Sequence, residues 1–233
     1  MKRTLIGILC IAGAIVLAAG CGNSNKKAER KAAEAAAEKA RLDSLEQVEM
    51  QKKEQEAMAT LATLPEEPVF DIVTNMGTIK VKLYSGTPKH RENFAKLALS
   101  GYYDGTIFHR VINGFMIQGG DPYSKNPEDE SKFGTGGPGY TIPAEFVPEY
   151  RHKKGALAAA RRGDAANPMK ESSGSQFYIV QDEQACKSLD GDYTVFGETL
   201  SGLDVVDKIA AVPTNQRNLP LNEVKIVKIS LSE

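Results

Sequence analysis

Residues 70 to 83 repeat with a period of two, and this repeat narrows the folds open to the chain more than any other feature. Apolar side chains or threonine occupy every second position from Phe70 to Thr74, and again from Ile79 to Leu83. Successive side chains of a β-strand point to opposite faces of its sheet. With a turn at Gly77 between the two runs, the pattern predicts a β-hairpin that buries one face.

The rest of the C-terminal part carries further signs of short strands. Short apolar runs separated by glycines recur at 106–112, 115–118, 155–160, 177–180 and 193–196, and residues 222–231 alternate again. Two stretches have helical spacing instead, one opened by Thr87-Pro88 and closed by Gly101, and one near 202–211. The balance predicts a mainly β fold, a closed antiparallel barrel with helical caps, in about 165 residues that suffice for a core.

The N-terminus has the form of a secretory signal peptide. Lys2 and Arg3 precede an apolar run from Leu5 to Ala19, and small residues lead to Cys21. The run of roughly 15 apolar residues is shorter than the ~20 that a membrane-spanning helix needs. The ending LAAGC resembles the bacterial lipoprotein signal, which implies cleavage before Cys21 and acylation of that cysteine. We therefore expect a signal peptide at 1–20 and lipidation at Cys21.

A spacer is expected between this anchor and the β-rich body, over residues 21–64. Residues 26–63 contain no glycine or proline and consist largely of Ala, Glu, Lys and Arg, which favour a helix. Pro65 and Pro68 end the pattern. A charged, partly disordered tether is the alternative, and the apolar positions do not sustain a heptad repeat. We favour a helical spacer, followed by the body at 65–233.

Charge excludes one class of partner. Residues 65–233 hold 19 Lys and Arg against 22 Asp and Glu, a balance of −3, within a chain of formal net charge −1. Nucleic-acid binding usually requires a basic surplus on some segment. We therefore expect no nucleic-acid partner.

A single arginine stands in the most apolar stretch of the body. Arg110 lies within FHRVINGFMIQGGD, residues 108–121, among phenylalanines, aliphatic residues and a methionine. A charged group is costly to bury without a partner. Two interpretations follow: a carboxylate pairs with Arg110, or Arg110 faces a groove that uses a fixed cation beside an apolar wall.

Motifs for other chemistries are missing from the sequence. The glycine-rich 134–139 segment lacks the Lys-Ser/Thr of a phosphate loop. The histidines His90, His109 and His152 do not have metal-ligand spacing. Cys186 has no partner for a disulfide once Cys10 leaves with the signal peptide, and it is expected to be a packing residue. We expect no metal, no cofactor and no side-chain nucleophile.

Five separated blocks resemble the cyclophilins, the peptidyl-prolyl cis–trans isomerases. They occur in the family's order over residues 69–233: FHRVINGFMIQGGD, GTGGPGYTIPAEF, GALAAAR, SSGSQFYI and LDGDYTVFGE. The resemblance implies a closed eight-stranded antiparallel barrel capped by two helices, here preceded by the long N-terminal helix. It also implies isomerase activity on proline-containing polypeptides, with no cofactor.

The resemblance also assigns roles by matching position. Arg110 would be the catalytic donor, and Gln118 would bind the substrate backbone and help set Arg110. The proline pocket would be walled by Phe115, Met116, Tyr178, Leu189 and Tyr193. The neighbouring groove would be lined by Ala160, Arg161 and Gln176.

Several positions depart from the family's common residues. Ser188 stands where many members have tryptophan, Tyr193 where histidine is common, and Tyr178 where phenylalanine is common. Loops 123–133 and 161–174 look longer than in compact members. Ser188 implies weak binding of cyclosporin-type inhibitors. The two loops border the groove in the family, so their length bears on substrate preference more than on the chemistry.

The sequence thus predicts a lipid-anchored isomerase that assists folding of exported proteins at a bacterial envelope, facing the periplasm. The residues after Cys21 lack the aspartate that retains many lipoproteins in the inner membrane, which favours the outer membrane. Two alternatives stay open: a proline-peptide binding module or holdase chaperone with little turnover, and a structural envelope spacer.

Overall fold

The computed structural model describes residues 23–233, so the predicted signal peptide and Cys21 lie outside the described residues. Within residues 23–233, no helix combines the length and the apolar character needed to cross a membrane. The chain divides into two compact units between Val48 and Glu49.

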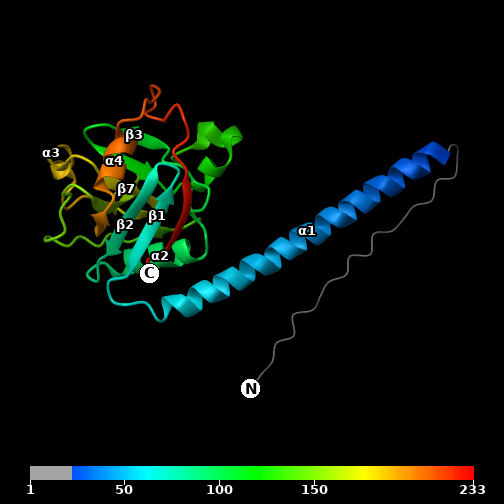
Figure 1. Cartoon of the computed structure of the whole chain (residues 1–233), viewed down its shortest axis with the longest axis horizontal. Helices are drawn as coiled ribbons and strands as arrows, with labels where there is room; N and C mark the ends of the chain where they lie inside the picture. Colours follow the sequence, from blue (N-terminus) through cyan, green and yellow to red (C-terminus); the bar gives the residue numbers. More distant parts are fainter. Residues whose placement is uncertain (1–22) are drawn as a thin grey trace, which may run out of the picture. The chain divides into compact units, whose positions relative to one another are not determined.

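Helix α1, Asn23–Leu61, is one uninterrupted helix of 39 residues, which confirms the predicted N-terminal helix (Figure 1). Its surface carries ion pairs at helical spacing, Arg30 with Glu34 at 3.6 Å and Lys52 with Glu56 at 3.8 Å. Within the second unit, the last turns of α1 belong to the body, since Ala57 is 3% exposed and Leu61 packs against the core.

Nine strands form one antiparallel sheet in the described part of the chain. Eight follow one another in the order β3-β4-β7-β6-β8-β2-β1-β9, and the short β5 pairs with β7 off this path. The strands are β1 Val69–Thr74, β2 Gly77–Leu83, β3 Arg110–Ile112, β4 Met116–Gly119, β5 Thr141–Ile142, β6 Ala156–Arg161, β7 Ser172–Val180, β8 Val195–Ser201 and β9 Ile226–Leu231. The predicted hairpin is β1–β2, with Phe70, Ile72, Ile79 and Val81 fully buried.

The predicted closure of the barrel is wrong: the sheet is a curled half-barrel whose end strands, β3 and β9, do not pair with each other. The outer edge of β3 is taken instead by the loop before β9, because Val111 N–H donates to the Asn218 carbonyl at 2.8 Å. Isolated bonds, such as Phe108 N–H to the Val224 carbonyl at 2.9 Å, join the segments that precede the two strands. Irregular backbone therefore fills the seam where a ladder was expected.

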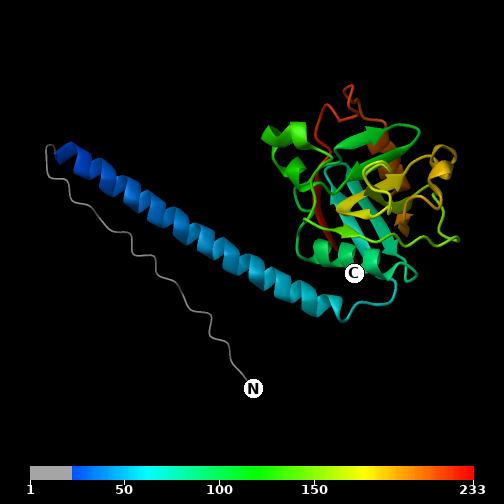
Figure 2. The same ribbon diagram turned by 180° about the vertical axis from the view of Figure 1, so that it is seen from behind.

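Two predicted helices pack on the sheet, α2 at Pro88–Leu99 and α4 at Leu203–Ala210 (Figures 1 and 2). Thr87 occupies the N-cap position of α2, but its side chain makes no capping bond. Glu145, 55 residues away from His90, supplies the cap: its carboxylate accepts from Lys89 N–H at 3.1 Å and His90 N–H at 3.0 Å. An anion at this end also suits the helix dipole. The sequence did not predict the short α3, Glu183–Cys186, or the 3₁₀ turns Pro122–Lys125, Pro127–Lys132 and Lys187–Leu189.

The two faces of the sheet bury two separate apolar clusters. On β7, Phe177 and Ile179 point into the main core, while Tyr178 and Val180 point to the opposite face and join a smaller cluster with Met116. This alternation follows from the period of two in a strand. The smaller cluster forms the floor of the candidate site described below.

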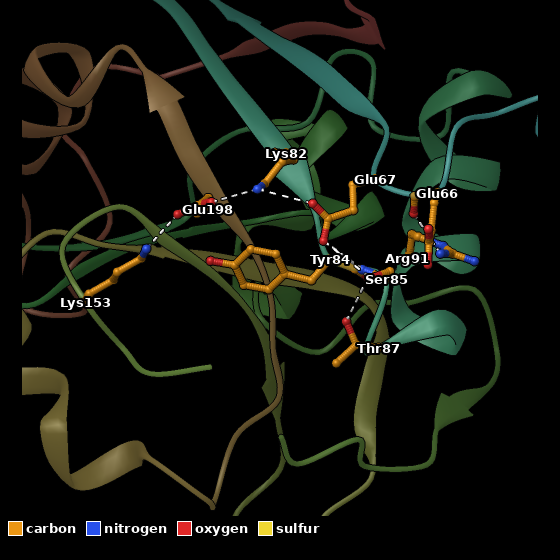
Figure 3. Close-up of polar contacts among 9 residues, drawn as sticks. All are labelled: Glu66, Glu67, Lys82, Tyr84, Ser85, Thr87, Arg91, Lys153 and Glu198. Carbon is orange, nitrogen blue, oxygen red and sulfur yellow. Dashed lines mark hydrogen bonds and ion pairs between the residues drawn. The ribbon is translucent and has the colours of Figure 1, made fainter. Parts of the chain in front are cut away.

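A strip of alternating charges ties β2 and β8 to the segment that precedes β1 (Figure 3). The Lys82 ammonium lies 3.2 Å from Glu67 and 3.0 Å from Glu198, and Glu198 also accepts a bond from Lys153 at 2.6 Å. The bond from Lys153 lowers the pKa of Glu198, and burial opposes this effect. The bond from Lys82 lowers the pKa further, so it stays below its ordinary value. Lys82 therefore forms ion pairs with two carboxylates at once.

The strip gives a pH-dependent contribution to stability. A lowered folded pKa stabilises the fold above the ordinary glutamate value of 4.5, and this stabilisation is lost as the pH falls through the folded pKa. At a pH above 4.5, Lys82→Met should lower the free energy of unfolding by about 1 kcal/mol, and the difference from the wild type should be smaller at lower pH. Urea denaturation above and below pH 4.5 checks this, with the exposed Lys187→Met as the control variant. A difference that does not depend on pH would contradict it.

Candidate active site

One row of side chains crosses four neighbouring strands on the face opposite the main core. Arg110 on β3 pairs with Gln118 on β4, Gln118 pairs with Tyr178 on β7, and Tyr178 pairs with Ala158 on β6. Paired residues of an antiparallel ladder lie on the same face. The register of the sheet thus brings together residues that lie up to 68 positions apart, from Arg110 to Tyr178.

The guanidinium of Arg110 is half-buried, and no carboxylate pairs with it among residues 23–233. Its neighbours are the Met116 sulfur at 3.8 Å, Gln118 Oε1 at 3.3 Å and the ring of Phe115, whose centroid lies 5.9 Å from Arg110 Cζ. Burial lowers the pKa of Arg110, but an arginine stays protonated across the physiological range. Of the two interpretations of Arg110, the structure agrees with the second, in which Arg110 faces a groove and does not pair with a carboxylate.

A chain of amides sets the position of Gln118. Gln118 Nε2 donates to Gln176 Oε1 at 3.0 Å, and Gln176 Nε2 donates to the Gly136 carbonyl at 2.8 Å. The buried Asp121 in turn accepts from Gly136 N–H at 3.1 Å and from Gly134 N–H at 2.5 Å. Because each amide uses its nitrogen on the next acceptor, the carbonyl oxygen of Gln118 is directed toward Arg110.

A cavity of about 150 Å³ opens beside the guanidinium. Nine of the ten residues predicted for the site line it: Arg110, Phe115, Met116, Gln118, Ala160, Arg161, Tyr178, Leu189 and Tyr193. The hollow exists because β6 places only alanines on this face, Ala156, Ala158 and Ala160, beside the larger residues of β4 and β7. The tenth, Gln176, lines an adjoining cavity of about 710 Å³.

Arg161 builds the pocket wall and is not free to bind a substrate anion. Its side chain is 4% exposed, donates to the Asp192 carbonyl at 2.8 Å and pairs with Asp164 at 2.6 Å. Its guanidinium carbon lies 4.4 Å from the centre of the Tyr193 ring, a cation–π arrangement. Arg161 therefore holds Tyr193 in place.

Cys186 supports the wall from below. It is fully buried, and its Sγ–H donates to the Phe115 carbonyl at 3.4 Å. Burial raises the pKa of the Cys186 thiol to about 12. A thiol that stays protonated is a poor nucleophile, so Cys186 acts as a packing residue.

The sequence reasoning missed two residues behind the pocket, His152 and Asp190. Nε2 of His152 lies 2.8 Å from the Tyr178 hydroxyl, and Nδ1 lies 2.7 Å from an oxygen of Asp190. A signal was available, because a buried tyrosine hydroxyl usually finds a hydrogen-bond partner. The substitution of Tyr178 for the family's phenylalanine therefore called for a polar neighbour.

The fold and this site agree with one family of known proteins. The model of the cyclophilin type peptidyl-prolyl cis-trans isomerase family matches residues 69–231. The chain belongs to the cyclophilin family. In the crystal structure of a cyclophilin type peptidyl-prolyl cis-trans isomerase from Cryptosporidium parvum, the match has a TM-score of 0.63 and 32% identity, and covers 72% of this chain and 98% of that one.

Curated relatives of this cyclophilin carry the same enzyme name. Peptidyl-prolyl cis-trans isomerase-like 1 of Neurospora crassa is 40% identical over 159 residues, 67% of this chain and 90% of the relative. Peptidyl-prolyl cis-trans isomerase-like 2 of Rhizopus delemar is 40% identical over 167 residues, but the chain spans only 28% of that longer protein. The cyclophilin domain is accordingly an enzyme of the peptidyl-prolyl isomerase class.

The amide chain gives a testable expectation for this cyclophilin. Gln176→Leu removes the acceptor of Gln118 and the donor to Gly136, so Gln118 loses its fixed orientation. We expect kcat/KM for an X–Pro peptide to fall about tenfold with the fold retained, as for one or two lost hydrogen bonds. Peptide kinetics and circular dichroism beside the exposed Gln216→Leu check this; unchanged kcat/KM in Gln176→Leu would contradict it.

Proposed function

We propose that this cyclophilin accelerates X–Pro rotation through Arg110, which donates a hydrogen bond to the prolyl nitrogen. Resonance gives the planar peptide bond its barrier of ~18–20 kcal/mol. In the twisted transition state, the nitrogen loses that resonance and gains a basic lone pair. A donor held at this nitrogen binds the transition state more tightly than either planar ground state, which is what catalysis requires.

The unpaired, half-buried guanidinium beside the apolar pocket supports this proposal most strongly. Since no carboxylate in the described part of the chain neutralises it, Arg110 keeps hydrogen-bond donors available for a substrate. The apolar walls exclude water around the bond, and electrostatic interactions strengthen in such a site. The walls would hold the proline ring while the preceding residue rotates. Gln118, fixed by Gln176, would bind the substrate backbone beside the reacting bond.

The mechanism predicts a steep loss on removal of the guanidinium. Arg110→Ala should lower kcat/KM by about 100-fold or more, and Arg110→Lys should recover little, because an ammonium lacks the planar fork. Arg217, an exposed arginine paired with Glu130 at 3.2 Å, provides the matched control Arg217→Ala. The measurement is cis-to-trans exchange of an X–Pro peptide by a protease-coupled assay. Retained activity in Arg110→Ala would refute the assigned role.

We further propose that the substrates are exported proteins and that the chain is a bacterial lipoprotein. The support is the N-terminal sequence alone: the basic flank, the short apolar run and the LAAGC ending. The relatives named above are eukaryotic and do not bear on this point. Lipidation of Cys21 would attach the chain to a membrane, with the protein facing the periplasm. The residues that follow Cys21 lack the aspartate of inner-membrane retention, which favours the outer membrane. Helix α1, at 1.5 Å per residue, would then serve as a spacer of roughly 58 Å.

This part of the proposal has its own test. In a bacterial host fed a radiolabelled fatty acid, we expect the label on the full chain and the chain in the membrane fraction. Cys21→Ser should lose the label and accumulate uncleaved, whereas Cys186→Ser should keep it, because that thiol is buried. A label that persists in Cys21→Ser would exclude acylation at this cysteine.

A second function, a holdase that binds unfolded polypeptides, is favoured by exposed apolar side chains near the groove. Tyr123 and Tyr140 line the larger cavity and are 40% and 47% exposed. Such side chains suit apolar residues that flank a proline. Peptide binding without faster exchange in the wild-type chain would favour the holdase over the isomerase.

A further inference from the structure

A buried hydrogen-bond chain runs from the proline pocket into the protein. The Tyr178 hydroxyl lies 2.8 Å from Nε2 of His152. Nδ1 of His152 lies 2.7 Å from Oδ1 of Asp190, and the same oxygen accepts from His152 N–H at 2.8 Å. Tyr178 is 4% exposed and His152 is 1% exposed, so solvent does not compete for the bond between them, whereas the Asp190 side chain is 16% exposed.

The chemistry of the three groups fixes the direction of the chain. An ionised carboxylate only accepts, so Nδ1 of His152 carries the ring proton and donates to Asp190. Nε2 is then the acceptor, and the Tyr178 hydroxyl donates to it. Burial lowers the pKa of His152 despite the bond to Asp190, which favours this neutral form. Although burial raises it, the bonds from His152 and Arg151 hold the pKa of Asp190 below its ordinary value.

The chain joins walls of the pocket that come from different parts of the sequence. Tyr178 belongs to β7, whereas Asp190 lies in the turn that carries Leu189 and Tyr193. That turn is closed by Tyr193 N–H, which donates to the Leu189 carbonyl at 3.1 Å. The rings of Tyr178 and Tyr193 then meet edge to face, with centroids 6.1 Å apart. The hydrogen-bond chain therefore links Tyr178 to the turn that carries the pocket residues Leu189 and Tyr193.

We propose that Asp190 and neutral His152 are positioning residues, which act through the Tyr178 hydroxyl to fix the walls of the proline pocket. This inference rests on the proposed isomerase function. When His152 takes a second proton, Nε2–H becomes a donor, so the Tyr178 hydroxyl can no longer donate to it and must turn to accept from it instead. The hydroxyl then leaves the orientation that the neutral chain fixes, and binding of the proline weakens. The titratable and charged groups around the chain are Arg151, Arg161, Cys186 and Tyr193.

The structure contains a matched control for this chemistry. His90 also lies between a carboxylate and a hydroxyl: Nδ1 is 2.6 Å from Glu145, and Nε2 is 2.9 Å from Ser172. None of these three residues lines the cavity beside Arg110. Ser172 is 1% exposed, so it cannot act as the nucleophile that this geometry resembles. His90→Gln therefore changes a buried histidine of the same kind outside the pocket.

The test measures kcat/KM of the full chain for an X–Pro peptide from about pH 4 to 8, because the lowered pKa of His152 places its titration below the ordinary histidine value of 6.5. We expect the wild type to lose activity toward low pH, mainly through KM. His152→Gln keeps an acceptor near the Nε2 position without a titrating group, so its profile should be flat. The pH profile of Tyr178→Phe should also be flat. Its kcat/KM at neutral pH should be about three- to tenfold below that of the wild type, which corresponds to the loss of one hydrogen bond. His90→Gln should retain the wild-type profile.

Two results would overturn the proposal: an acid-side loss in Tyr178→Phe and His152→Gln equal to that of the wild type, or ¹⁵N NMR showing the ring proton of His152 on Nε2. Arg110→Ala in the same series separates this inference from the proposed function. If the wild type turns over and Arg110→Ala does not, a failure of the His152 variants concerns the positioning chain alone. If neither the wild type nor any variant turns over the peptide, the proposed function fails. The positioning chain is then tested by the peptide Kd, which must change with the variants and with pH in the order expected above for kcat/KM.

Discussion

The pairing of β7 with three other strands is the constraint on which the rest of the structure depends. This nine-residue strand pairs with β4, β5 and β6, and the period of two sends Phe177 and Ile179 into the main core. The same pairing places Gln176 and Tyr178 on the opposite face, beside Gln118 of β4. A shift of one residue would exchange the two faces and abolish both the core and the site. The stability of the core thus fixes the geometry of the groove.

The site uses a half-buried cation that no carboxylate pairs with among residues 23–233, an arrangement that core packing alone would disfavour. Arg110 remains half-buried, with a sulfur, an amide oxygen and an aromatic ring as its neighbours. Amide groups fix its surroundings without neutralising its charge, so the guanidinium stays available to a substrate. A carboxylate at the position of Gln118 would orient Arg110 as well, but it would compete for the guanidinium.

The sequence predicts the local helices and strands and the residues that line the site. It does not predict the hydrogen bonds between distant segments that hold them in place. The β1–β2 hairpin and α2 follow from periodicity and from Pro88, and nine predicted residues share one cavity. Closure failed because the bond from Val111 to the Asn218 carbonyl depends on an irregular loop that has no period. The cap of α2 by Glu145 was equally hidden, since 55 residues separate the carboxylate from His90.

In the proposed mechanism, Arg110 stabilises the twisted state of the substrate and contributes little to binding of the planar one. The most direct test is NMR of an X–Pro peptide at saturating enzyme, which gives both the Kd and the exchange rate on the enzyme. For Arg110→Ala, we expect a Kd within about threefold of the wild type and a bound-state exchange rate lower by about 100-fold. An unchanged exchange rate with a weakened Kd would show that Arg110 only binds the peptide, and would refute the proposed mechanism.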